Sequence, residues 1–325
     1  MIDIKMDKYV FGPVPSRRLG QSLGIDPVPL KTCNWNCVYC QLGRTKPFIT
    51  DRKTYVDTQT ILNQTRAALK NHQPGEIDWV TLIGSGETCL HSGVGDMIRA
   101  VRDMTDLPIA VITNGSLLDL SEVREELLAA DAVLPSLDAG NTALFRKVNR
   151  PHPSLTFERH VNGLLQFREV YQNRLWVEVM LIQGVNDTEK ELIEIADEMK
   201  RIQPDEIHII QPTRPPVEPW VAPPDAEGLI RAHSILGETS KTILPAEGVF
   251  DLGSEDNLID AIIGVITRHP MKESELVEAL ALWPKVDVMQ TLDDLRLSGE
   301  AQVVVRYGTR FWSASAANYP NHQPA

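Results

Sequence analysis

The sequence is poor in cysteine, in aromatic residues and in long apolar runs. Only four of its 325 residues are cysteines and 6% are aromatic, and no apolar run is long enough to cross a bilayer. So few cysteines, without a secretory signal peptide, argue against a disulfide-stabilised secreted protein and indicate a reducing compartment. We therefore expect a cytoplasmic protein with no membrane partner.

Basic residues are also scarce relative to acidic ones. The chain has 32 lysines and arginines against 44 aspartates and glutamates, which gives a net charge of −12. Proteins that bind nucleic acids usually carry a basic face, because the phosphates must be neutralised. The balance therefore argues mildly against a polynucleotide partner, although a local basic face can lie within an acidic total. The length allows one large domain with a smaller one attached.

Three of the four cysteines lie within eight residues, as Cys33, Cys37 and Cys40 with the spacing C-x3-C-x2-C. A structural zinc site has four protein ligands, and a cubane cluster is normally held by four thiolates. Zinc would need a distant fourth ligand, since the nearest histidine downstream is His72. A thioredoxin-like pair of Cys37 and Cys40 would leave Cys33 unexplained. We interpret the loop as one that holds an iron–sulfur cluster with one open iron position.

Short β-branched runs alternate with longer amphipathic segments over the first three quarters of the chain. The expected strands cover residues 23–26, 79–83, 109–113, 132–136, 175–181 and 206–210. The expected helices cover residues 58–70, 94–104, 121–129, 154–171 and 188–201. Such strand–helix repeats imply a parallel sheet with right-handed crossovers. The periodicity alone does not distinguish an open sheet from a curved barrel.

The pattern changes after a Gly/Asp/Ser-containing break at residues 248–257. Beyond it we expect helices at 258–269, 272–282 and 286–298, then strands 302–306 and 310–314 around a hairpin turn at 307–309. Three helices followed by a hairpin are typical of a winged helix. The predicted organisation is a main domain at 1–250, a winged-helix domain at 256–315 and a loose tail at 316–325.

An aromatic residue, Tyr39, directly precedes the third cysteine of the loop. This C-x3-C-x-aromatic-C loop after a first strand resembles the signature of the radical S-adenosylmethionine (SAM) superfamily. With the segments FGPVPSRRLG at 11–20, SLGID at 22–26 and GSGE at 84–87, the chain from about residue 9 to about residue 245 resembles stand-alone Fe-S oxidoreductases grouped near the wyosine-tRNA synthases. The resemblance implies an α/β fold, a partial (βα)6 radical SAM barrel.

The resemblance also implies the cofactors and a partner. In this family the three cysteines hold a [4Fe-4S] cluster, and the amino and carboxylate groups of SAM chelate the fourth iron. Reduction cleaves SAM to a 5′-deoxyadenosyl radical that abstracts hydrogen from a substrate. An external one-electron donor of the ferredoxin or flavodoxin type is the implied partner.

Candidate SAM contacts follow the strands, because in such barrels the active face lies at the carboxyl ends of the strands. Some of them have bland alternatives, such as a ring that packs the loop, a turn residue or a helix cap. By resemblance, the cofactor-binding residues are Tyr39 (adenine), Ser85, Gly86 and Glu87 (ammonium group), Asn114 (methionyl or ribose), Ser136 and Asp138 (ribose or carboxylate), and the backbone of Val185 (adenine).

The resemblance assigns no cofactor contact to a further group of polar and aromatic residues. Cys89 is a candidate catalytic thiol or, alternatively, a small buried apolar residue. Substrate contacts are expected from two segments after the fourth and sixth strands, or these are a solvated loop and a rigid spacer; their members are Arg146, Asn149, Arg150, His152, Arg214 and Trp220. Arg17 and Arg18 resemble an anion clamp, but they precede the first strand and should lie near the opposite end of the barrel unless the segment folds back. His208 is expected to be an interior histidine.

Three functions remain open. The first is a radical SAM enzyme acting on an unidentified substrate, and the second is a tRNA-base modifier. The third is an iron–sulfur sensor whose winged helix reads DNA. Residues 255–325 contain ten acidic and six basic residues, so DNA binding would lose most of its electrostatic affinity. We expect this region to contact protein or substrate instead.

Overall fold

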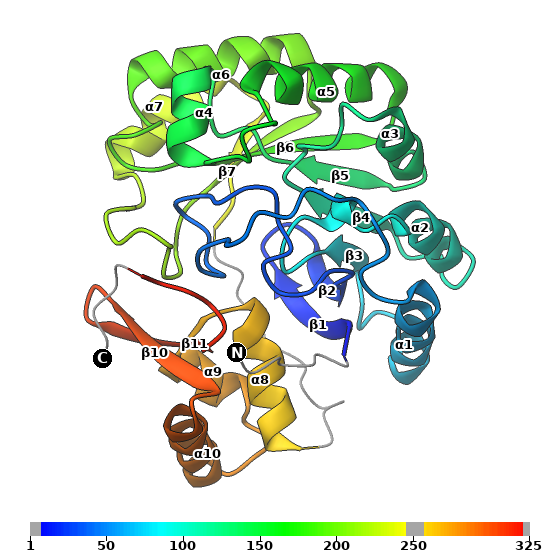
Figure 1. Cartoon of the computed structure of the whole chain (residues 1–325), viewed down its shortest axis with the longest axis vertical. Helices are drawn as coiled ribbons and strands as arrows, with labels where there is room; N and C mark the ends of the chain where they lie inside the picture. The colour runs from blue at the N-terminus through cyan, green and yellow to red at the C-terminus, as the bar shows by residue number, and fades with distance from the viewer. Residues whose placement is uncertain (1–7, 245–256, 321–325) are drawn as a thin grey trace.

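Eight strands form one sheet whose spatial order follows the chain from β1 to β8 (Figure 1). The computed structural model describes residues 8–244 and 257–320. The six expected strands are present and parallel, as β2 (Gly20–Ile25), β3 (Trp79–Ile83), β4 (Ile109–Thr113), β5 (Ala132–Pro135), β6 (Arg174–Met180) and β7 (Glu206–Ile210). Two strands were not expected: β1 (Val10–Ser16), which is antiparallel to β2, and the short parallel β8 (Ser240–Thr242).

The sheet is strongly curved. Arg18, in the turn between β1 and β2, forms an ion pair with Glu178 on β6. In a flat sheet β2 and β6 would be four strand spacings apart, or about 19 Å, beyond the reach of one side chain. Since β1 and β8 do not pair in the described part of the chain, the sheet curves without closing.

Helices alternate with the strands and cover the outer side of the sheet (Figure 1). They are α1 (Thr58–Asn71), α2 (Val94–Arg102), α3 (Ser121–Leu127), α4 (Thr142–Val148), α5 (Phe157–Val170), α6 (Glu189–Ile202) and α7 (Ala226–Leu236). The predicted start of α6 is confirmed, because the Thr188 side chain accepts a hydrogen bond from the Glu191 N–H. The short helix α4 was not expected. No helix in residues 8–244 and 257–320 is long and apolar enough to cross a membrane.

A C-terminal unit, which we define as residues 257–320, has its own core. It contains α8 (Leu258–Arg268), β9 (Met271–Lys272), α9 (Glu273–Ala279), α10 (Lys285–Ser298), β10 (Ala301–Arg306) and β11 (Thr309–Ala314). The expected three helices and hairpin are therefore present, and β9 adds a third strand beside β11. Trp312 is fully buried at the centre of this core.

The chain beyond residue 315 differs from the expected loose tail as far as residue 320. Ala317 and Tyr319 are only 3% and 8% exposed. Asn318 pairs with Gly43, and the Tyr319 hydroxyl donates to the Gln41 carbonyl. The polar composition concealed these contacts, which lie about 280 residues apart in sequence. Residues 321–325 and nearly all of the expected break at 248–257 lie outside the described residues.

Candidate functional site

The three clustered cysteines lie half-buried in the loop after β2, whereas Cys89 is 1% exposed. Trp35, within the loop, is buried and packs edge-on against Phe145 at 5.2 Å, which anchors the loop in the core. Burial raises the pKa of Cys33 to about 12 and raises the pKa of Cys37 well above its usual value. Since metals bind the thiolate, loading this loop must release protons.

A lysine faces the sulfurs. The Lys31 Nζ lies 3.1 Å from the Cys40 Sγ. Burial tends to lower the pKa of Lys31, but the negative charge of Cys40 and Cys33 outweighs it and the pKa is raised. Sequence reasoning missed this residue; its only signal was a cation two positions before the first cysteine.

Two amides lie beside the other two thiols. The Asn114 Nδ2 is 3.9 Å from the Cys33 Sγ, and the Asn149 Nδ2 is 3.8 Å from the Cys37 Sγ. Each of the three thiols therefore has at least one nitrogen donor next to it, and Cys33 also accepts from the Trp35 N–H at 3.4 Å. Hydrogen bonds to sulfur stabilise an anionic cluster and tune its potential, so these residues fit an iron–sulfur group. Within the described ranges, no three His, Cys, Asp or Glu side chains converge on one point where a single metal ion could bind, whereas in a cubane cluster each thiolate binds a different iron.

The Gly-Ser-Gly-Glu turn after β3 lies directly on the cysteine loop. A Cβ at Gly86 would lie 2.0 Å from the Thr32 carbonyl oxygen, so only glycine allows this approach. The Glu87 N–H donates to the same carbonyl at 2.8 Å, and the Lys31 N–H donates to the Ser85 carbonyl at 2.7 Å. The structure thus brings the two predicted motifs together.

The carboxylate of Glu87 is fully buried and accepts only internal hydrogen bonds. Its donors are the Thr113 hydroxyl at 2.5 Å and the backbone N–H groups of Asn114 and Cys89 at 2.7 and 2.9 Å. Burial raises the pKa of Glu87 although these donors oppose the shift. In this structure Glu87 holds the turn against the end of β4.

Asp138 has a similar part on the other side of the loop. It is 2% exposed and accepts from the Tyr39 hydroxyl at 2.6 Å, the Asn149 amide at 2.6 Å and the Met180 N–H at 2.7 Å. Burial raises its pKa. Ser136 does not share these contacts: its carbonyl accepts from His160, and its hydroxyl has no hydrogen bond within the described chain. Their joint contact with SAM stays a prediction.

The remaining expected residues occupy varied positions. The backbone of Val185 lies in a turn after β6, and the Asp187 carboxylate accepts from the Gly184 N–H at 2.6 Å within that turn. Cys89 belongs to the main core, and burial raises its pKa well above the usual value, as expected for a small buried apolar residue. His208 is an interior histidine paired with Glu206 at 2.8 Å.

The candidate substrate residues after β5 and β7 are partly used in ion pairs. Arg150 pairs with the buried Glu218 at 2.6 Å, and Arg44 pairs with the same carboxylate. His152 contacts Ser154, while Arg146 is exposed. Trp220 is 48% exposed.

Arg17 and Arg18 do not lie near the opposite end of the barrel, where they were expected unless their segment folds back. The Arg17 Nη2 donates to the Thr213 hydroxyl at 2.6 Å, in the loop after the carboxyl end of β7. Arg18 reaches Glu178 inside the curved sheet. The turn therefore folds back toward the active side, which local strand order could not reveal.

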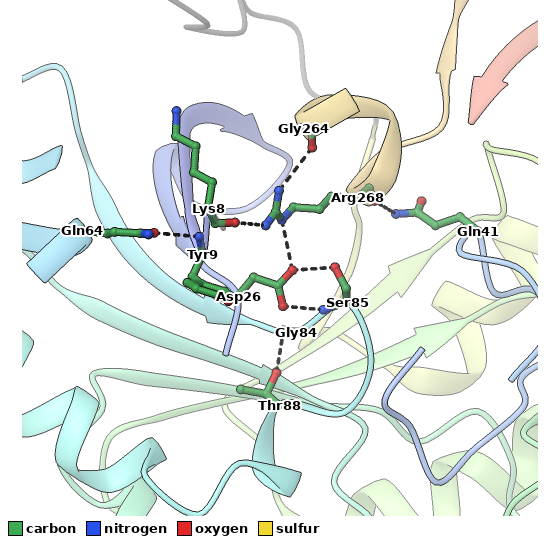
Figure 2. A network of polar contacts seen from close by, with 10 residues as sticks. All are labelled: Lys8, Tyr9, Asp26, Gln41, Gln64, Gly84, Ser85, Thr88, Gly264 and Arg268. Atoms are coloured by element: carbon green, nitrogen blue, oxygen red, sulfur yellow. Dashed lines mark hydrogen bonds and ion pairs between the residues drawn. The ribbon is translucent and has the colours of Figure 1, made fainter. Parts of the chain in front are cut away.

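A polar network joins the C-terminal unit to the site (Figure 2). Asp26, at the end of the loop-facing strand β2, accepts from the Ser85 N–H and hydroxyl at 2.8 and 2.6 Å and from the Arg268 Nε at 3.0 Å. The Arg268 carbonyl accepts from the Gln41 amide at 3.2 Å, next to Cys40. Arg268 of α8 thus contacts the residue that follows Cys40 and is linked through Asp26 to the Gly-Ser-Gly-Glu turn, although it lies 242 positions from Asp26 in sequence.

The family model of the radical SAM superfamily matches residues 28–199, just over half of the chain and including the cysteine loop. The chain belongs to the radical SAM superfamily. Members of this superfamily are enzymes, and membership implies an iron–sulfur cluster and SAM as cofactors. The membership of the radical SAM superfamily that the sequence motifs indicated is therefore confirmed.

Relatives of this radical SAM protein include a UPF0026 protein from Methanocaldococcus jannaschii, 34% identical over 275 residues, which cover 83% of this chain and 85% of that one. A protein from Brachyspira hyodysenteriae named GTPase Obg is 43% identical over 207 residues. That match covers 64% of this chain but only 30% of the longer relative. Among solved structures, a radical SAM methyltransferase from Sphaerobacter thermophilus has a TM-score of 0.54 at 18% identity, covering 68% of this chain and 66% of that one. This likeness supports the α/β fold with a parallel sheet.

Proposed function

We propose that this protein is a radical SAM enzyme that holds a [4Fe-4S] cluster on Cys33, Cys37 and Cys40 and acts on a substrate still to be identified. The observation that carries the proposal is the pairing of each half-exposed thiol with a nitrogen donor, within the segment that matches the superfamily. When bound and reduced, such a cluster supplies the electron that cleaves SAM to methionine and a 5′-deoxyadenosyl radical. The protein would be cytoplasmic and would receive that electron from a ferredoxin or flavodoxin.

The residues of the chain prepare the site for this chemistry. Lys31 places a positive charge beside Cys40, and Asn114 and Asn149 point amide donors at the other thiols. These groups offset the negative charge that the thiolates bring, so they favour both loading and reduction. Holding and shielding the cofactor is the task of the protein, because the cofactor carries the difficult chemistry.

Two buried carboxylates would stabilise the backbone around the SAM site without contacting SAM themselves. Glu87 and Asp138 satisfy internal donors, so they fix the backbone around the site rather than offering free oxygen atoms. On this proposal, SAM is bound by the rest of the predicted set: Tyr39, Ser85, Gly86, Asn114, Ser136 and the backbone of Val185.

The C-terminal unit, if it is a winged helix, lacks the surface that a DNA reader needs. Arg306 is 9% exposed, and its guanidinium donates to the carbonyls of Arg214 and Val221. Arg310 pairs with Glu273 at 3.4 Å. The wing arginines are therefore engaged within the chain, which favours an enzyme over a DNA-binding sensor.

Anaerobic reconstitution with iron and sulfide tests the proposal. The wild type should bind about four irons per chain and release 5′-deoxyadenosine from SAM when dithionite is added. Alanine variants of Cys33, Cys37 or Cys40 should lose both properties. Cys89→Ala is the matched control, because it removes a thiol from the core and should keep the iron. A wild type that binds the cluster but never cleaves SAM under several reductants would refute the enzymatic assignment.

A further inference from the structure

Two half-buried arginines beside the cysteine loop have no carboxylate partner in the described ranges. Arg17, in the β1–β2 turn, donates to the Thr213 hydroxyl at 2.6 Å. Arg214, in the loop after β7, donates to the Gln41 side-chain oxygen at 3.2 Å and to the His269 Nδ1 at 3.3 Å. All of these partners are neutral. In a chain of net charge −12, acidic residues are plentiful, so the lack of a carboxylate within ion-pair distance of either arginine in the described ranges is informative.

Three acidic residues around the two arginines are already paired with other cations. Glu178 pairs with Arg18, and Asp26 pairs with Arg268. Glu275, which acts on Arg214 from a distance, pairs with Lys272. Glu178 acts on Arg17 as well as on Arg18, so the positive charge of Arg17 and Arg214 is only partly compensated by the protein.

The arginines also act unfavourably on each other. Burial and the neighbouring charge of Arg17 lower the pKa of Arg214 to about 10. Burial and the charge of Arg18 lower the pKa of Arg17, although the nearby Glu178 opposes this shift. Partly desolvated like charges are costly unless an anion completes the site.

Free donors remain at this cluster. Only one nitrogen of each guanidinium has a partner among the described residues. His269 accepts from Arg214 at Nδ1, so its proton sits on Nε2, which is buried and has no acceptor. Burial and the nearby arginines lower the pKa of His269 well below its usual value, which keeps the ring neutral. Planar guanidinium groups with free N–H pairs match the oxygen pairs of carboxylates and phosphates.

The cluster lies where a substrate would meet the reactive centre. Gln41 directly follows Cys40, and Thr213 and Arg214 follow the carboxyl end of β7, the end at which such α/β folds bind ligands. We propose that Arg17 and Arg214 bind a carboxylate or phosphate group of the substrate, a proposal that rests on the proposed function. The enzyme would then act on an anionic small molecule, or on an anionic group of a larger one, held beside the cysteine loop.

Anion binding can be measured without turnover. Cluster-loaded protein is titrated anaerobically with pyrophosphate, and separately with citrate, by calorimetry at constant ionic strength set with chloride. The wild type should bind at least one of them, and Arg17→Gln and Arg214→Gln should each weaken that binding about tenfold or more, the usual loss for a hydrogen bond to a charged group. Arg99→Gln is the matched control, since Arg99 is exposed and its one ion pair among the described residues is with Asp96, at 2.7 Å on its own helix. Circular dichroism of each variant in chloride checks the fold.

Equal affinities for all four proteins, or no binding by the wild type, would overturn the proposal. The titration is repeated with saturating SAM to identify the source of the anion. Displacement of the probe by SAM would show that the arginines bind the SAM carboxylate, and the substrate site would then be refuted. If the probe binds as expected but SAM is never cleaved, the anion site stands and the proposed function fails.

Discussion

Breaking the ion pair between Arg268 of α8 and Asp26, the residue after β2, should destabilise the protein strongly. In Arg268→Met, the side chain keeps much of its length but loses its charge. The ion pair it forms with Asp26 has an N–O distance of 3.0 Å, and the two side chains are 6% and 0% exposed. Removing one partner of a buried pair typically costs about 3–5 kcal/mol, because the other charge is left without compensation.

The lower end of that range is expected here. Asp26 keeps two donors from Ser85, which partly satisfy its carboxylate. The variant also loses the stacking of the guanidinium over Phe11 at 4.8 Å, worth about 1 kcal/mol. We therefore predict a fall in the free energy of unfolding of about 4 kcal/mol.

Urea unfolding of the cluster-free protein, compared between variants, gives this change. The double variant Arg268→Met with Asp26→Asn should be more stable than the sum of the single changes by about 2 kcal/mol, since it removes both charges. Arg296→Met is the control, because the Arg296–Asp293 pair at 3.5 Å is exposed and worth less than about 1 kcal/mol. If Arg268→Met costs no more than this control, the buried pair does not hold the two units together. SAM affinity of the reconstituted protein is measured in parallel: Arg268→Met should lower it by misplacing Ser85, and Arg268→Lys should restore part of it.

Two further predictions concern the thiols and the core. Lys31→Met removes the positive charge 3.1 Å from Cys40, so the midpoint potential of the bound cluster should become more negative, whereas that of Lys31→Arg should stay close to the wild type. An anaerobic redox titration followed by absorbance measures both potentials. An unchanged potential in Lys31→Met would contradict the role assigned to this lysine. Burial lowers the pKa of His160 from 6.5 to about 4, so between these pH values only the unfolded chain gains this proton and stability falls as the pH falls. The wild type should therefore lose about 3 kcal/mol more than His160→Gln between pH 7 and pH 4 in urea titrations, and parallel stability curves for the two proteins would refute the burial argument.

The parallel strands could be predicted because each is a local apolar run between turn signals. The first strand of the sheet could not. Residues 10–16 contain Gly12, Pro13 and Pro15, which normally argue against a strand. They are tolerated because β1 is an edge strand with an irregular register against β2. The strand β8 has only three residues, too few for any periodicity.

The sulfur ligands could likewise be predicted, because their spacing is local. The donors beside them could not be predicted. Lys31 and Asn149 come close to the sulfurs because of how two loops fold in space, and the sequence does not reveal that fold. Sequence order also misplaced Arg17, because the curvature of the sheet brings the β1–β2 turn to the end of β7. Contacts that depend on sheet curvature leave no periodic signal in the chain.

The C-terminal unit is part of the site rather than an appendage, and two adjacent residues show why. Arg268 turns inward to Asp26, which holds Ser85 in the Gly-Ser-Gly-Glu turn. The next residue, His269, accepts from Arg214 in the loop after β7. A displacement of the end of α8 would therefore disturb the turn proposed to bind SAM and the arginine proposed to bind substrate at the same time. The Arg268–Asp26 contact is buried and the Arg214–His269 contact is partly buried, so breaking either one has a cost. The end of α8 thereby fixes the position of the turn relative to Arg214.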